Sequence, residues 1–178
     1  MPVELTASHY SADLSQPIWD MTAGDALRRA AALAGERMAL VEVVPEGMAS
    51  LVGMAATDRR WTYAELLAEA EACAAWLLTR FRPGDHVCLW APNVPEWVIV
   101  QYGAALAGLV LVTANPSLRA EELRHVLDRA QAKALIHASA FRGTDMAAIA
   151  AVVARAPQPP SMARFGSLCN SNSRTPAA

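Results

Sequence analysis

Hydrophobic and polar positions recur along the chain with two periods, and these periods predict its secondary structure. At 25–35 apolar residues recur at helical spacing, which predicts an amphipathic helix that ends at Gly35. Residues 38–44 and 59–63 are rich in β-branched and aromatic residues and predict the two strands of a hairpin. The connecting segment 45–58 is long for a hairpin loop, so we expect it to fold over the surface or to be poorly ordered.

A second helix has the clearest boundaries. Thr62 followed three residues later by Glu65 is a capping box, in which the hydroxyl and the carboxylate each satisfy a free backbone amide. Apolar residues then recur at helical spacing up to Leu78, and Pro83 and Gly84 end the segment.

From residue 86 onward short apolar runs alternate with helical segments. The expected strands are 86–91, 109–113 and 133–138, and the expected helices are 94–107, 118–130 and 144–154. This alternation predicts an α/β fold with a mostly parallel sheet flanked by helices and right-handed crossovers. The first of these helices is apolar on nearly all sides, so we expect it to be buried on more than one face. After Arg155 no period is visible and Pro, Ser and Asn cluster, so this tail is expected to be mostly disordered.

Composition and charge exclude some classes of function. The 178 residues carry a formal net charge of −2, which does not create the positive field of a nucleic-acid-binding protein. The apolar run 98–114 is interrupted by Gln101 and is shorter than the roughly 20 residues of a membrane span, so no transmembrane segment is expected. The N-terminus lacks the basic start and apolar run of a signal peptide, and we expect a cytoplasmic protein.

Cysteine and histidine spacing does not indicate a metal or redox site. The cysteines are odd in number, without C-x-x-C spacing, and suit buried thiols in a reducing cytoplasm. The histidines share no metal-ligand spacing. These residues are Cys73, Cys88 and Cys169, and His9, His86, His125 and His137.

Ligands of parallel sheets bind at the carboxyl ends of the strands, here the segments after Trp90, Thr113 and His137. The first segment offers Asn93 and Glu96, but helix capping is favoured over a site role for both.

The second segment offers Asn115 and Ser117, which are better explained as a turn former and a helix N-cap. In the third segment, His137 with Ser139 and Thr144 does not make a hydrolytic triad, because a triad needs geometry from separated segments.

Neither a G-x-x-x-x-G-K-S/T nor a G-x-G-x-x-G phosphate loop occurs. The acids Glu65, Glu69, Glu121 and Glu122 lie where exposed helix faces and first turns favour negative charge. The residues by themselves therefore indicate an α/β fold without an assembled active site.

Three linked motifs go beyond the generic fold. The runs "WTYAEL", "RPGDHVCLWAPNVPEWV" and "AALAGLVLVTANPSLRAEELRHVL", in this order, resemble the N-terminal part of AMP-forming acyl-CoA synthetases of the adenylate-forming superfamily, especially medium-chain fatty-acid CoA ligases. The likeness covers residues 8 to about 158. It implies the incomplete N-terminal subdomain of the ligase fold at 21–155, preceded by a leader at 1–20 and followed by a disordered or out-of-family tail at 156–178.

The resemblance also implies a reaction. A carboxylate such as a fatty acid attacks Mg-ATP to give an acyl-adenylate, and coenzyme A then displaces AMP. In the family the phosphate loop, the adenine- and ribose-binding groups and the catalytic Lys come later than these motifs. Lys133 matches no catalytic lysine, and no residue of this chain is expected to be catalytic, to hold a cofactor or to bind metal.

Three hypotheses follow. The first is an N-terminal fragment of such a ligase, inactive alone and exposing apolar surface; a frameshift, a truncated gene model or a genuine remnant would each explain it. The second is a non-catalytic docking or regulatory module that binds a ligase or itself through that surface. The third, a self-sufficient small α/β enzyme, is the weakest, because no nucleophile, base or cofactor loop can be named.

Overall fold

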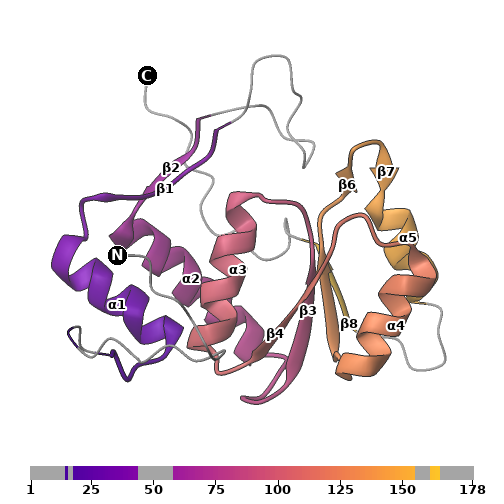
Figure 1. The fold of residues 1–178 in the computed structure, drawn as a ribbon, viewed down its shortest axis with the longest axis horizontal. Helices are drawn as coiled ribbons and strands as arrows, with labels where there is room; N and C mark the ends of the chain where they lie inside the picture. The colour runs from indigo at the N-terminus through magenta and orange to yellow at the C-terminus, as the bar shows by residue number, and fades with distance from the viewer. Residues whose placement is uncertain (1–14, 16–17, 44–57, 155–160, 165–178) are drawn as a thin grey trace, which may run out of the picture.

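The computed structural model describes residues 15, 18–43, 58–154 and 161–164 (Figure 1). Outside this description lie most of the leader, segment 45–58 except Asp58, and most of the tail. His9 and Cys169 are among these residues. The helices are α1 Ala23–Ala34, α2 Tyr63–Leu78, α3 Pro95–Leu106, α4 Ala120–Ala130 and α5 Met146–Val153. The strands are β1 Met38–Val41, β2 Arg60–Thr62, β3 His86–Trp90, β4 Val110–Ala114, β5 Ala134–His137, β6 Ala140–Phe141, β7 Thr144–Asp145 and β8 Ser161–Arg164.

The central sheet is parallel, as the alternation of strands and helices predicts. Its strand order is β4-β3-β5-β8, and all three pairings are parallel. Figure 1 shows α1, α2 and α3 on one side of this sheet and α4 and α5 on the other. Strand β3 therefore connects outward to β4 through α3, whereas β5 connects in the opposite direction to β8. The chain reverses its winding between β3 and β5, which is where doubly wound sheets bind ligands.

Burial in the sheet and α3 explains the apolar runs of the sequence. The side chains of Val87, Leu89 and Trp90 in β3 are fully buried, as expected for a central parallel strand covered on both faces. Within α3 only Gln101 is exposed, which confirms that this helix is buried on more than one face. Gly103 lets α3 approach α2, because a Cβ at this position would lie 2.7 Å from Sγ of Cys73.

The N-terminal elements also follow the sequence. Strands β1 and β2 form the predicted antiparallel hairpin. The capping box is present at the start of α2, where Thr62 Oγ1 accepts from the Glu65 amide and Glu65 Oε2 accepts from the Thr62 amide. Helix α1 ends at Ala34 with Gly35 as its C-cap, although Gly35 keeps a right-handed conformation with φ −50°.

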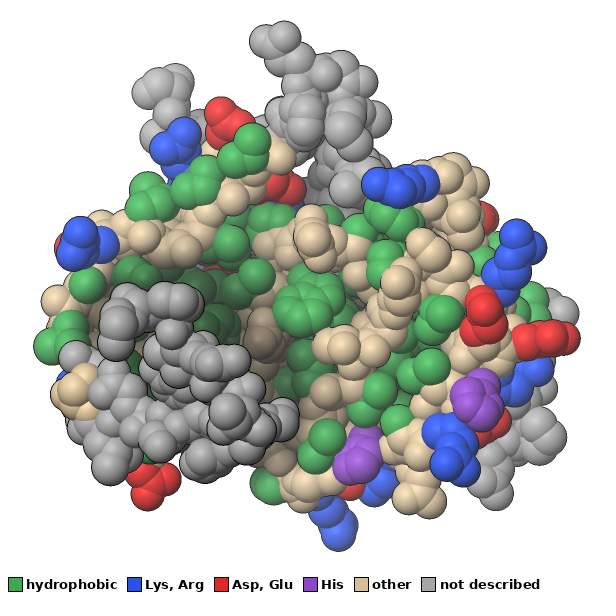
Figure 2. All heavy atoms as spheres, in the orientation of Figure 1, with side chains coloured by type: hydrophobic (Ala, Val, Ile, Leu, Met, Phe, Trp, Pro, Cys, Tyr) green, Lys and Arg blue, Asp and Glu red, His purple; other side chains and the backbone are tan. Residues whose placement is uncertain are grey.

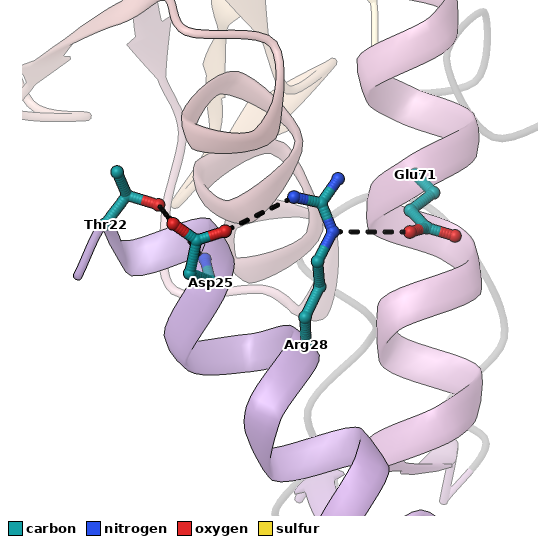
Figure 3. Close-up of polar contacts among 4 residues, drawn as sticks. All are labelled: Thr22, Asp25, Arg28 and Glu71. Atoms are coloured by element: carbon teal, nitrogen blue, oxygen red, sulfur yellow. Dashed lines mark hydrogen bonds and ion pairs between the residues drawn. The ribbon is translucent and has the colours of Figure 1, made fainter.

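Helices α1 and α2 are linked at the surface by a series of polar side-chain contacts (Figure 3). Asp25 lies between Thr22 Oγ1 at 2.7 Å and Arg28 Nη1 at 3.4 Å, and Arg28 Nε reaches Glu71 Oε1 at 3.8 Å. Half of each charged side chain is exposed, so these ion pairs contribute little to stability.

Several local predictions are wrong. Asn93 does not cap α3: the N-cap residue is Val94, without a side-chain hydrogen bond, and Glu96 is buried in an ion pair with Arg59. Ser117 does not cap α4, whose N-cap is Arg119. Residues 140–145 form a β6–β7 hairpin before α5 begins, instead of the start of a helix at 144.

The tail is not irregular throughout. Residues Ser161–Arg164 form β8, which adds a parallel strand to β5. A short strand at a sheet edge needs no strong period of its own, because its pairing comes from the neighbouring strand.

The apolar run 98–114 is divided between α3 and β4. Among the residues that the structure describes, no helix is both long and apolar enough to cross a membrane.

Candidate functional site at the carboxyl edge of the sheet

The loops that follow β3, β4 and β5 lie at one edge of the sheet. Because the three strands are parallel and in register, Trp90, Ala114 and His137 end side by side. The structure therefore brings together the segments that the sequence indicates as candidate ligand-binding loops. The point where the winding reverses lies between the loops after β3 and β5.

The two candidate residues after β3 lie in different environments. Asn93 is exposed, so its amide is free to meet a ligand. Glu96 is only 7% exposed and points into the protein at the start of α3. A carboxylate is buried at such a position only where it has a partner.

The partner of Glu96 is Arg59, which the sequence did not indicate as a functional residue. Arg59 Nη1 donates to Glu96 Oε1 at 2.5 Å, while its Nε and Nη2 donate to the two carboxylate oxygens of Glu42 at 2.8 and 3.0 Å. The guanidinium also lies 5.4 Å from the ring of Trp61. This Arg59 cluster fastens both strands of the β1–β2 hairpin to the N-terminus of α3.

The charges of the cluster are not balanced. Hydrogen bonds and charge from Glu42 and Glu96 raise the pKa of Arg59, so it stays protonated. Glu96 Oε2 is buried and has no hydrogen-bond partner among the described residues. Burial, and then the charge of Glu96, raise the pKa of Glu69 in α2. Two carboxylates therefore share one guanidinium, and a third carboxylate, Glu69, lies near enough to Glu96 for their charges to interact.

The loop after β4 is structural. The side-chain Oδ1 of Asn115 accepts from the Ser117 amide at 2.9 Å, which is the turn that the sequence predicts. The carbonyl oxygen of Asn115 accepts from Nε1 of the buried Trp90, also at 2.9 Å. These bonds tie the loop to β3.

The loop after β5 holds the remaining candidates. His137 is 4% exposed, and its Nδ1 lies 2.8 Å from the carbonyl oxygen of Ala138. Ser139 and Thr144 are exposed, and Thr144 belongs to β7. A buried ring bonded to the backbone favours a structural role for His137.

The single lysine lies at the opposite edge of the sheet. Lys133 precedes β5, and its Nζ bonds Oδ1 of Asp85 at 2.6 Å. The hydrogen bond from Lys133 lowers the pKa of Asp85. Nearby, Nδ1 of His86 lies 2.6 Å from the carbonyl oxygen of Ala130. Lys133 is therefore an ion-pair partner at the amino edge, away from the candidate loops.

Two further acids, Glu65 and Glu122, have helix-terminal roles. Glu65 caps α2, and Glu122 Oε2 accepts from the Arg119 amide at 2.8 Å at the start of α4. Across the described ranges, no group of three or more His, Cys, Asp or Glu residues could hold a metal ion.

Three comparisons with known proteins bear on this arrangement. Residues 27–169 match the family model described as AMP-binding enzyme. A mitochondrial medium-chain acyl-CoA ligase of Danio rerio is 30% identical over 139 residues, which is 78% of this chain and 21% of that protein. The chain thus spans about a fifth of the length of this relative.

Solved structures of acyl-CoA synthetases are similar to this chain in fold. The N-terminal domain of FACL13 from Mycobacterium tuberculosis superposes with a TM-score of 0.69 and 29% identity, covering 89% of this chain and 38% of that one. A Mycobacterium tuberculosis fatty acyl CoA synthetase gives a TM-score of 0.68 and 28% identity, covering 84% and 28%. The family match continues to residue 169, beyond the limit near 158 that the sequence motifs suggest, and so includes β8.

Proposed function

The chain belongs to the AMP-binding enzyme family, and we propose that it is the N-terminal portion of a ligase that joins a carboxylate, such as a medium-chain fatty acid, to coenzyme A. The observation that carries this proposal is the family match over residues 27–169, which spans the whole parallel sheet. The likeness to the N-terminal domain of an acyl-CoA synthetase supports it. In such a reaction the carboxylate displaces pyrophosphate from ATP, and the thiol of coenzyme A then displaces AMP from the acyl-adenylate.

We propose that this chain alone is inactive. The reaction needs donors for the phosphates, a carboxylate for Mg²⁺ and a cation for the developing charge. At the carboxyl edge the exposed candidates Asn93 and Ser139 are neutral, and Arg59 and Glu96 are bound to each other. Lys133 is paired at the other edge. The contribution of these residues to a complete enzyme is a scaffold: the sheet aligns three loops, and the Arg59 cluster orients the hairpin beside them. We further propose that residues 21–155 form the N-terminal subdomain of the ligase. We also propose that the protein is located in the cytoplasm.

The test is a pyrophosphate-exchange assay on the purified chain with ATP, Mg²⁺ and octanoate. We expect no exchange above a protein-free control, and exchange that depends on octanoate would overturn the proposed inactivity.

A chimera tests family function independently. The aligned 139-residue segment of the Danio rerio ligase is replaced by that of this chain. Retained thioester formation supports the proposal. A folded chimera that binds neither ATP nor fatty acid contradicts it.

A second candidate function is a docking module that binds itself or a ligase. Large apolar side chains are exposed in several described elements, including Leu33 at 76%, Val43 at 79% and Val110 at 43%. Exposed apolar surface of this kind favours association. Light scattering of the purified chain tests self-association, because a discrete oligomer is expected and a monomer at all concentrations would contradict it. Co-sedimentation with an acyl-CoA ligase tests the other partner, and no complex there would contradict docking on a ligase.

A further inference from the structure

Strand β4 is an edge strand without the usual protection. It pairs with β3 on one side, and no described strand pairs with it on the other. Its sequence is VLVTA, and no charged residue occurs between Glu96 and Arg119. Natural edge strands are normally blunted by charge, proline or a bulge, since a free edge invites another strand. Figure 2 shows hydrophobic side chains gathered over β4 and the adjoining side of α3.

The hydrogen bonds of β4 identify which backbone groups are free. The Val110 amide donates to the Asp85 carbonyl oxygen at 2.9 Å, and Val110 is paired with His86 in the parallel register. Because successive residues of a strand point their backbone groups to opposite sides, Val112 and Ala114 also face β3. The amides and carbonyls of Leu111 and Thr113 therefore face outward. We call these four groups the β4 edge.

We propose that the β4 edge pairs antiparallel with the same edge of a second copy of this chain, making one continuous sheet across a two-fold axis. Leu111 of one copy then lies opposite Thr113 of the other, and the reverse, so all four outward groups of each copy are paired. Val112 lies opposite its own symmetry mate. A two-fold interface needs a self-complementary surface, and the β4 edge is symmetric about Val112.

The charge and the side chains of β4 are compatible with a second copy of this chain as the partner. Two identical strands pair badly when like charges face each other, and β4 carries none. Val110, which is 43% exposed, lies opposite Ala114 of the partner copy, so a large side chain meets a small one. The inference rests on the second candidate function, self-association, and is independent of the ligase proposal.

The first test uses sedimentation equilibrium of the wild-type chain and two variants. The wild type is expected at twice its 19.0 kDa mass. Thr113→Pro removes an outward amide that β3 does not use, and edge strands tolerate proline at such positions. We expect Thr113→Pro to raise the dimer Kd at least tenfold, because two intermolecular hydrogen bonds are lost. The matched control Thr113→Val keeps the amide and should remain a dimer.

Cross-linking locates the interface without relying on a proline variant. In a Cys169→Ser background, Val112→Cys places two thiols across the axis, where Cα atoms of a non-hydrogen-bonded pair are about 4.5 Å apart and a disulfide can form. The control Val110→Cys places its thiols about 13 Å apart, given a rise near 3.4 Å per residue. We expect a covalent dimer for Val112→Cys only.

The outcomes separate the proposals. A wild-type monomer at all concentrations overturns the inference and self-association together. A dimer that persists in Thr113→Pro, with no preference for cross-linking at Val112, leaves self-association standing and overturns the β4 pairing. Neither outcome bears on the ligase proposal, which the chimera tests.

Discussion

Arg59, directly before β2, and Glu96 at the start of α3 are 37 residues apart in sequence and meet through a 2.5 Å hydrogen bond between Nη1 and Oε1. This contact joins the hairpin to the parallel sheet at its carboxyl edge. It also makes the stability of the hairpin depend on a buried charge.

Replacing Arg59 should therefore be costly. Arg59→Met leaves Glu96 buried without a countercharge and should lower the free energy of unfolding by about 3 kcal/mol in urea denaturation. The matched control is Arg28→Met, at a half-exposed ion pair with Glu71, which should cost less than about 1 kcal/mol. The double variant Arg59→Met with Glu96→Gln should recover part of the loss. Equal effects of the two arginine replacements would contradict the importance of burial.

Glu69 should make stability fall as the pH rises. Burial and the charge of Glu96 raise the pKa of Glu69 above its ordinary value of 4.5, so the folded chain holds this proton more tightly than the unfolded chain. The contribution to stability is present below pH 4.5 and is lost as the pH rises through the folded pKa. Glu69→Gln should thus melt at a higher temperature than the wild type at pH 7, and the difference should shrink towards pH 4.5. Glu71→Gln, on the exposed face of α2, should not show this gain.

Close packing of α2 on α3 should make Gly103 sensitive to substitution. In Gly103→Ala the new Cβ would meet Sγ and Cβ of Cys73 at 2.7 and 2.8 Å. Sγ can rotate away, but Cβ of Cys73 cannot move without shifting a helix, so a loss of about 1–3 kcal/mol is expected in urea denaturation. In Gly24→Ala the closest atom is the flexible tip of Leu106 at 2.8 Å, and the cost should be smaller. The reverse order would show that α2 and α3 can separate easily.

The turn between β6 and β7 should be improved by substitution. Arg142 and Gly143 have φ of 46° and 79°, as a type I′ hairpin turn requires, but only glycine and asparagine adopt this region readily. Arg142→Asn should raise the free energy of unfolding by about 0.5–1 kcal/mol in urea denaturation. Gly143→Ala should lower it. A loss of stability in Arg142→Asn would mean that the contact of the guanidinium with the Phe141 ring, at 5.2 Å, outweighs the backbone strain.

Cys88 should be chemically inert in the folded chain. Burial in β3 raises the pKa of its thiol to about 12, so hardly any thiolate exists at pH 8. Peptide mapping after iodoacetamide treatment at pH 8 should find Cys88 unmodified in buffer and modified in guanidinium chloride. Rapid modification in buffer would show that the sheet opens readily.

Much of the fold could be predicted because its signals are local. The capping box of Thr62 and Glu65 needs only neighbouring residues, and the alternation of apolar runs with helices is sufficient to indicate a parallel sheet. The three linked motifs between residues 61 and 127 were sufficient to identify the family. Prediction failed at Asn93 and Ser117, where a cap-forming residue type was present but the helix began one or two residues later.

By itself, then, the sequence determined the order of the main helices and strands up to β5, the family and the segments that follow β3, β4 and β5, because periodicity and capping act within a few residues. Only the tertiary structure decided that Glu96 is a buried ion-pair partner of Arg59, that β8 extends the sheet, and that no described strand pairs with the outer side of β4. Each of these depends on which distant segments pack together, and a residue type that suits a helix cap suits a buried ion pair equally well until its neighbours in space are known.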